Sequence, residues 1–89
     1  MAKQYKPHAM ELVEVEWTDS FYDPTYDGDP AEYSTKVARL LNIGYFIKRG
    51  RDGIVLASCR EATEGTVRHM MTIPRENVRG IYPCQRKEG

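Results

Sequence analysis

The sequence predicts a mainly β protein, with five short strands in one domain that covers residues 10–83. Several short runs alternate apolar and polar side chains, which is the period of a half-buried strand. Glycine, proline, aspartate and asparagine separate these runs, as they do at turns. The chain has 89 residues, and a domain of this size has a thin core that self-association often supplements. We therefore also expect a homo-oligomer.

The first strand is expected to begin at residue 10, after a flexible N-terminal tail formed by residues 1–9. Val13, Val15 and Trp17 alternate with glutamates, so the apolar set should face a core and the acidic set should face solvent. The glutamates also discourage pairing with a strand of another molecule.

Residues 18–33 are expected to form a long loop, because proline, glycine and aspartate recur there. The loop also holds four aromatic residues: Phe21, Tyr22, Tyr26 and Tyr33. These rings can form an exposed recognition surface or lie back over the end of the sheet, and we expect the second arrangement. The aspartates lack the spacing of a calcium-binding loop, so no metal site is predicted.

A helical turn is expected near residues 30–35, where Asp29 can cap the turn and Pro30 can occupy its first position. The spacing of apolar residues over 30–41 fits both a helix and a strand. We expect the helical turn to give way to a long strand that bends at Gly44, because glycine inside a strand often marks such a bend.

A hairpin is expected from residues 43–49 and 54–59. Gly50 and Gly53 bracket its turn, where glycine permits the positive φ angles of tight hairpins. Both faces of the 54–59 run are apolar, which predicts that this strand is central in the sheet and that Cys59 is a buried packing residue.

A fourth strand is expected at residues 66–73, followed by one helical turn near 75–77 and a last short strand that starts at Val78. Pro83 ends the last strand, since proline cannot donate a hydrogen bond to a sheet. Residues 84–89 are polar and are expected to form a flexible C-terminal tail.

The formal net charge of zero hides a division of charge along the chain. Residues 11–35 carry eight acidic side chains and no lysine or arginine, whereas residues 36–89 carry eleven basic and five acidic side chains. Either the two parts attract each other, or the basic part presents a surface that binds anions.

No catalytic, cofactor or metal motif stands out, which predicts a protein that is not an enzyme and has no cofactor. His8 and His69 are far apart in the chain, and no nucleophile and base occur in a recognisable grouping. Cys59 and Cys84 are too few for a disulfide framework, which favours the cytoplasm. No apolar run is long enough to span a membrane.

The order of the expected elements resembles that of Src-homology-3-like small barrels. In particular, the turn Ile-Pro-Arg-Glu-Asn-Val at residues 73–78 resembles the proline-led turn before the last strand of that fold. The resemblance implies a five-stranded closed barrel. Trp17 is the only tryptophan, so the tryptophan pair of the proline-peptide groove is absent and that activity is not expected. Val-Arg-Gly at residues 78–80 is similar to the last motif of Sm-like barrels, which are the alternative.

A second resemblance is to small accessory proteins encoded by tailed bacteriophages. The similar segments are Val-Glu-Val-Glu-Trp-Thr-Asp at 13–19, Ile-Gly-Tyr-Phe-Ile at 43–47, Ile-Val-Leu-Ala at 54–57, and Ile73-Pro74 followed by Val78. The chain departs from that group in the insertion at 21–33. The resemblance implies a phage protein that acts in the bacterial cytoplasm, and it assigns no activity.

Three binding functions are consistent with the sequence. The first is implied by the phage resemblance: sequestration of a nucleotide-type host immune signal in a basic and aromatic pocket between subunits. Its chemistry would need arginine to bind phosphate and aromatic rings to stack on bases. The candidate residues are Arg39, Arg60, Arg68, Arg79, Trp17, Tyr22 and Tyr26. The second is an inhibitor or adaptor that binds a host enzyme through the acidic, tyrosine-rich loop 19–32. The third is nucleic-acid binding by the basic part, which the eight carboxylates oppose.

Overall fold

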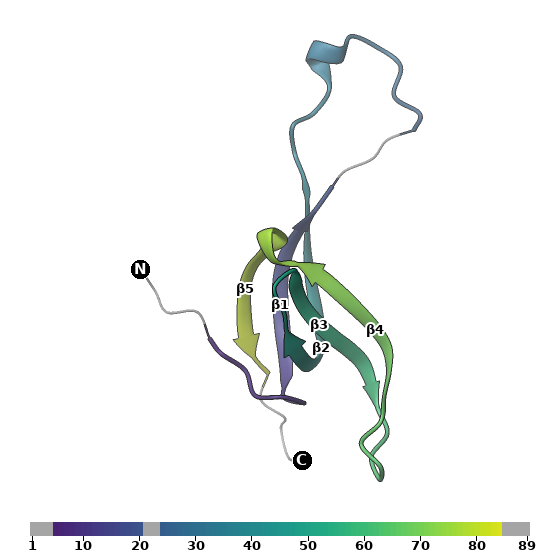
Figure 1. Cartoon of the computed structure of the whole chain (residues 1–89). Helices are drawn as coiled ribbons and strands as arrows, with labels where there is room; N and C mark the ends of the chain where they lie inside the picture. The colour runs from purple at the N-terminus through teal and green to yellow at the C-terminus, as the bar shows by residue number, and fades with distance from the viewer. Residues whose placement is uncertain (1–4, 21–23, 85–89) are drawn as a thin grey trace.

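A computed structural model describes residues 5–20 and 24–84 (Figure 1). Its five strands form one antiparallel sheet in the order β4-β3-β2-β1-β5, and its only helical segments within these residues are two single 3-10 turns. The elements are β1 (Leu12–Asp19), η1 (Pro30–Glu32), β2 (Ala38–Arg49), β3 (Gly53–Arg60), β4 (Val67–Pro74), η2 (Arg75–Asn77) and β5 (Val78–Pro83). The prediction of a mainly β chain with five strands is confirmed, as are the helical turns after Asp29 and after Pro74.

The core lies on one face of the sheet and is formed by alternate residues of each strand. In β1, Val13 and Val15 are fully buried and Trp17 is 8% exposed, as the alternation in the sequence predicts. The other strands contribute Phe46, Ile54, Leu56, Ile73 and Ile81. The opposite side of the sheet, here called the outer face, carries the glutamates of β1.

The outer face is not uniformly polar, because β2 and β5 place apolar side chains beside the glutamates. Glu14 pairs with Ile43 on β2 and with Tyr82 on β5, and Glu16 pairs with Leu41. Leu41 and Ile43 are 64% and 60% exposed. Pairing of β2 with β3 begins only at Tyr45, so no β3 residue pairs with this first part of β2 to shield these side chains.

The central strand of the sheet is β2, and β3 lies between β2 and β4. The prediction that residues 54–59 form the central strand was therefore wrong by one position. The pairing of β2 continues without interruption through Gly44, and its register with β3 shifts between Phe46 and Lys48. The irregularity in β2 is thus a bulge at Ile47, where the register with β3 shifts, and not an interruption at Gly44, where a bend was expected. Gly44 is buried, and a Cβ there would lie 3.0 Å from the carbonyl oxygen of Ala57, so Gly44 permits close approach of two strands.

Two expectations for the hairpin of β2 and β3 were wrong. Neither Gly50 nor Gly53 has a positive φ; Gly65 is the described glycine that does, with φ 77°. Gly53 is needed because a Cβ at this position would collide with the backbone carbonyl of Ile73 on β4. Cys59 is exposed, because the last residues of β3 extend past the edge of the core.

Tyr5 and Met10, which precede β1, contact the sheet. Tyr5 packs on the core and its hydroxyl donates a hydrogen bond to Glu11. The Met10 N–H donates to the Phe46 carbonyl. The outer parts of both predicted tails, residues 1–4 and 85–89, lie outside the described residues. No described helix has the length and apolar character needed to cross a membrane.

Candidate functional site

An exposed arm connects β1 to β2 and extends well away from the sheet (Figure 1). Residues 24–37, here called the acidic arm, are all exposed except Tyr33, which is half-buried. The expectation that the aromatic rings of this loop lie back over the sheet was therefore wrong for Tyr26 and Tyr33. Phe21 and Tyr22 lie outside the described residues.

The acidic arm has internal order although it lacks the support of the sheet. The Asp29 carboxylate accepts a hydrogen bond from the Ala31 N–H at 3.0 Å and so caps η1. The Tyr26 hydroxyl donates to the Asp29 carbonyl at 2.6 Å. The rings of Tyr26 and Tyr33 meet edge to face, with their centroids 4.6 Å apart. These contacts hold the two rings together away from the core.

The two tyrosines frame a shallow groove of about 480 Å³ at the far end of the arm. Its walls are Tyr26, Asp27, Gly28, Pro30 and Tyr33. Asp27, Asp29 and Glu32 are exposed around it, and the arm has one basic residue, Lys36, near its root. The arm therefore presents negative charge beside two amphipathic rings, which are common anchors in protein interfaces.

The four arginines predicted to bind phosphate lie on four different strands. Arg39 on β2 forms an ion pair with Glu16 at 2.5 Å, and this hydrogen bond raises the pKa of Arg39. Arg60 on β3 lies over the ring of Tyr45, 5.3 Å from its centroid. Arg79 on β5 donates to the Glu76 carbonyl at 2.9 Å.

Arg68 on β4 lies one register position away from Arg60. Cys59 pairs with Arg68 and Arg60 pairs with Val67, and successive pairs alternate between the two faces of a sheet. The register therefore places Arg60 and Arg68 on opposite faces, next to the turn that joins β3 to β4.

The predicted aromatic residues are also separated. Trp17 belongs to the core, and its indole N–H donates to the Asn42 side-chain oxygen at 2.7 Å. Tyr26 lies in the acidic arm, and Tyr22 lies outside the described residues. Within a single chain, the ring of Trp17 is occupied by packing, so it is not available for stacking on a ligand.

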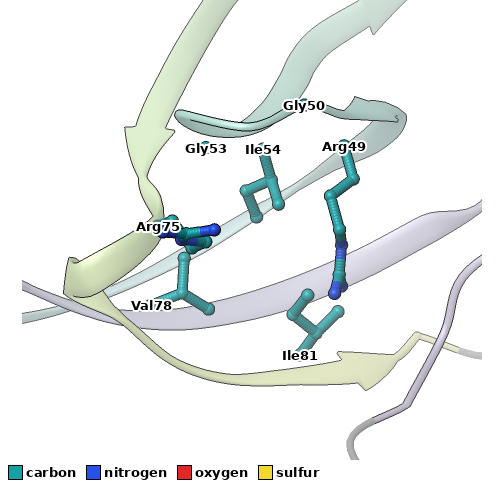
Figure 2. Close-up of a pocket in the computed structure, with 7 residues that line it drawn as sticks. All are labelled: Arg49, Gly50, Gly53, Ile54, Arg75, Val78 and Ile81. Carbon is teal, nitrogen blue, oxygen red and sulfur yellow. The ribbon is translucent and has the colours of Figure 1, made fainter.

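Sequence reasoning missed a pocket between the hairpin of β2 and β3, η2 and β5. This hairpin pocket has a volume of about 210 Å³ and is lined by Arg49, Gly50, Gly53, Ile54, Arg75, Val78 and Ile81. Figure 2 shows Arg49 reaching across the pocket toward Ile81, with Arg75 entering from the side of η2 next to Val78. Arg49 and Arg75 are far apart in the sequence, and only the fold of the hairpin brings them to one pocket.

The part of the chain that the structure describes contains no group of three or more histidine, cysteine, aspartate or glutamate side chains able to hold a metal ion. Comparison with protein families, with curated proteins and with solved structures found no match to this chain. The acidic arm and the hairpin pocket are the two described regions whose residues suggest binding of a partner or ligand.

Proposed function

We propose that the protein is a non-enzymatic adaptor or inhibitor that binds a basic partner protein through the acidic arm. The observation that carries this proposal is the projection of residues 24–37 from the sheet, with their described carboxylates and Tyr26 exposed and Tyr33 half-buried. A segment that only connected β1 to β2 would need no more than a short turn, since Asp19 and Ala38 are directly paired.

The chemistry of the arm favours a basic partner over other classes. Asp27, Asp29 and Glu32 would repel nucleic acid and attract a surface rich in lysine and arginine. Tyr26 and Tyr33 supply apolar area held by their mutual contact, so little side-chain entropy is lost when a partner covers them. The partner of the earlier prediction, a host enzyme, is compatible with this surface.

The proposal is tested by selecting binders from a displayed library of random 12-residue peptides. We expect the selected peptides to be enriched in lysine and arginine over the starting library. The triple variant Asp27→Asn, Asp29→Asn, Glu32→Gln should bind the selected peptides roughly tenfold or more weakly in fluorescence polarisation, because it removes three exposed charge contacts. Asparagine at position 29 retains the capping oxygen, so η1 should persist.

A matched control removes three charges elsewhere: Glu14→Gln, Glu64→Gln and Glu76→Gln. This variant has the same net charge as the arm variant, and we expect it to bind the peptides as the wild type does. Equal weakening of both variants would show a non-specific charge effect and would contradict the proposal. So would selected peptides without an excess of basic residues.

We also infer that the sheet belongs to the class of small barrels with the Src-homology-3-like strand order. The support is that β5 pairs with β1, that a proline-led turn joins β4 to β5, and that the residues of the core cluster lie on one face. A phage origin stays a prediction of the sequence resemblance alone.

A further inference from the structure

We propose that the hairpin pocket binds the carboxylate of a small branched aliphatic acid, either a free acid or the C-terminus of a peptide. Arg49 and Arg75 would hold the carboxylate, while Ile54, Val78 and Ile81 contact the aliphatic group. The proposal does not depend on the acidic arm.

The bulge at Ile47 gives Arg49 its place in the pocket. Before the bulge, Phe46 faces the core and pairs with Leu56; after it, Arg49 pairs with Ile54, whose side chain also faces the core. Regular alternation from Phe46 would have put Lys48 on the core side and Arg49 on the outer face. The inserted residue reverses this, which is how bulges redirect side chains next to binding sites.

Backbone hydrogen bonds hold the two sides of the pocket together. The Arg75 N–H donates to the Asp52 carbonyl at 2.9 Å, which ties η2 to the turn of the hairpin. The Gly50 N–H donates to the Gly53 carbonyl at 2.8 Å and closes that turn. The separation of the backbones that carry Arg49 and Arg75 is therefore set by the fold, whereas their exposed side chains would become ordered when they bind the carboxylate.

The charge of the pocket is positive and uncompensated. Neither Arg49 nor Arg75 forms an ion pair with a described residue, in contrast to Arg39 with Glu16 and Arg51 with Asp52. Among the described residues that line the pocket, none is acidic. Lys6 adds a further positive charge, because it lines an adjoining hollow that shares Arg49.

The lining of the pocket selects the class of anion. Ile54, Val78 and Ile81 line it together with the two arginines, in a volume of about 210 Å³. A phosphate alone would leave this aliphatic lining without a contact. A carboxylate matches the planar guanidinium fork, and a branched four-carbon group matches Ile54, Val78 and Ile81.

The test is a titration of the ¹⁵N-labelled full chain with 3-methylbutanoate, followed by the backbone amide signals of Gly50, Gly53 and Val78. We expect saturable shifts in the millimolar range, and none with the neutral 3-methylbutanamide. N-acetyl-Gly-Leu with a free or an amidated C-terminus separates the two sources of the acid. Tighter binding of the free peptide acid than of 3-methylbutanoate would assign the pocket to peptide termini, and the reverse would assign it to free acids.

Two variants test the arginines. Arg49→Gln and Arg75→Gln should each weaken binding roughly tenfold, the usual effect of losing one charged hydrogen-bonding partner. Arg51→Gln is the matched control: Arg51 lies in the same turn, outside the pocket, with a side chain that is 91% exposed, and its removal should leave binding unchanged.

If Arg49→Gln does not fold, Arg49→Lys keeps the charge, loses the bidentate fork and should still weaken binding severalfold. The proposal is overturned by shifts that do not saturate or that the neutral amide reproduces. Wild-type affinity in the variants, or stronger binding of inorganic phosphate than of the acid, would overturn it as well.

Discussion

The bond between Trp17 and Asn42 offers a direct test of whether the single tryptophan serves the core or a ligand. The indole N–H donates to the Asn42 side-chain oxygen at 2.7 Å, and Trp17 is 8% exposed. Asn42→Ala leaves the N–H without its partner, and an unsatisfied buried donor costs about 1–3 kcal/mol. Asn42 is itself half-buried, so water can partly replace it and we expect a loss of about 1–2 kcal/mol. In a domain of this size, each kcal/mol lowers the melting temperature by ~4–8 °C.

The assay is urea unfolding followed by circular dichroism, which also reports on variants that lack Trp17, the only tryptophan in the chain. Asn42→Asp retains an oxygen acceptor and should recover most of the lost stability. Trp17→Phe removes the donor, so adding Asn42→Ala to it should cost much less than Asn42→Ala alone. A loss below about 0.5 kcal/mol for Asn42→Ala, or equal losses with and without the indole, would refute the reasoning.

Three further predictions concern the N-terminal contact, the hairpin and the outer face. The hydrogen bond from Tyr5 holds the pKa of Glu11 below its ordinary 4.5 and raises the pKa of Tyr5 above 10.0. The stability contributed by ionised Glu11 is therefore present above pH 4.5 and is lost as the pH falls. The stability contributed by protonated Tyr5 is present below pH 10 and is lost as the pH rises. Tyr5→Phe should destabilise the protein at pH 7 and have less effect at pH 3, as measured by urea midpoints. Gly53→Ala should lower the free energy of unfolding by about 1–3 kcal/mol, because its Cβ would displace the β4 backbone. Gly50→Ala should lower it little in the same assay, because a Cβ there would have no atom nearer than 4.0 Å. We expect the wild-type protein to sediment as a dimer or larger species and the double variant Leu41→Glu, Ile43→Glu to sediment as a monomer. These exposed side chains lie where β2 pairs with β1 but not with β3. A monomeric wild type would contradict this.

The strands were predictable because their signals are local. Val13, Val15 and Trp17 alternate over a full strand, and the proline after Ile73 marks where β4 must end. Each signal needs only the two-residue period of a strand or the missing N–H of proline. These rules operate within a few residues and do not require the rest of the fold.

The binding regions were harder to predict because they depend on distant contacts. The bulge at Ile47 is hidden in a run that is apolar on both faces, so no change in the alternation reveals that Arg49 has moved to the core side. Whether an aromatic loop folds back or projects depends on whether its rings find partners in the loop, as Tyr26 and Tyr33 do. The wrong expectation for Cys59 has a similar cause, since composition does not show where a strand leaves the core.

The pocket and the end of β1 that precedes the acidic arm are both in contact with η2. Arg75 lines the pocket from the first position of η2, and the side-chain amide of Asn77, its last residue, donates to the Thr18 carbonyl on β1 at 2.6 Å. Figure 1 shows η2 beside β1, the strand from which the arm leaves. A change in η2 should therefore affect the pocket and the end of β1, whereas Arg49→Gln and the arm variant each alter one binding region. This difference is what allows the two binding proposals to succeed or fail independently.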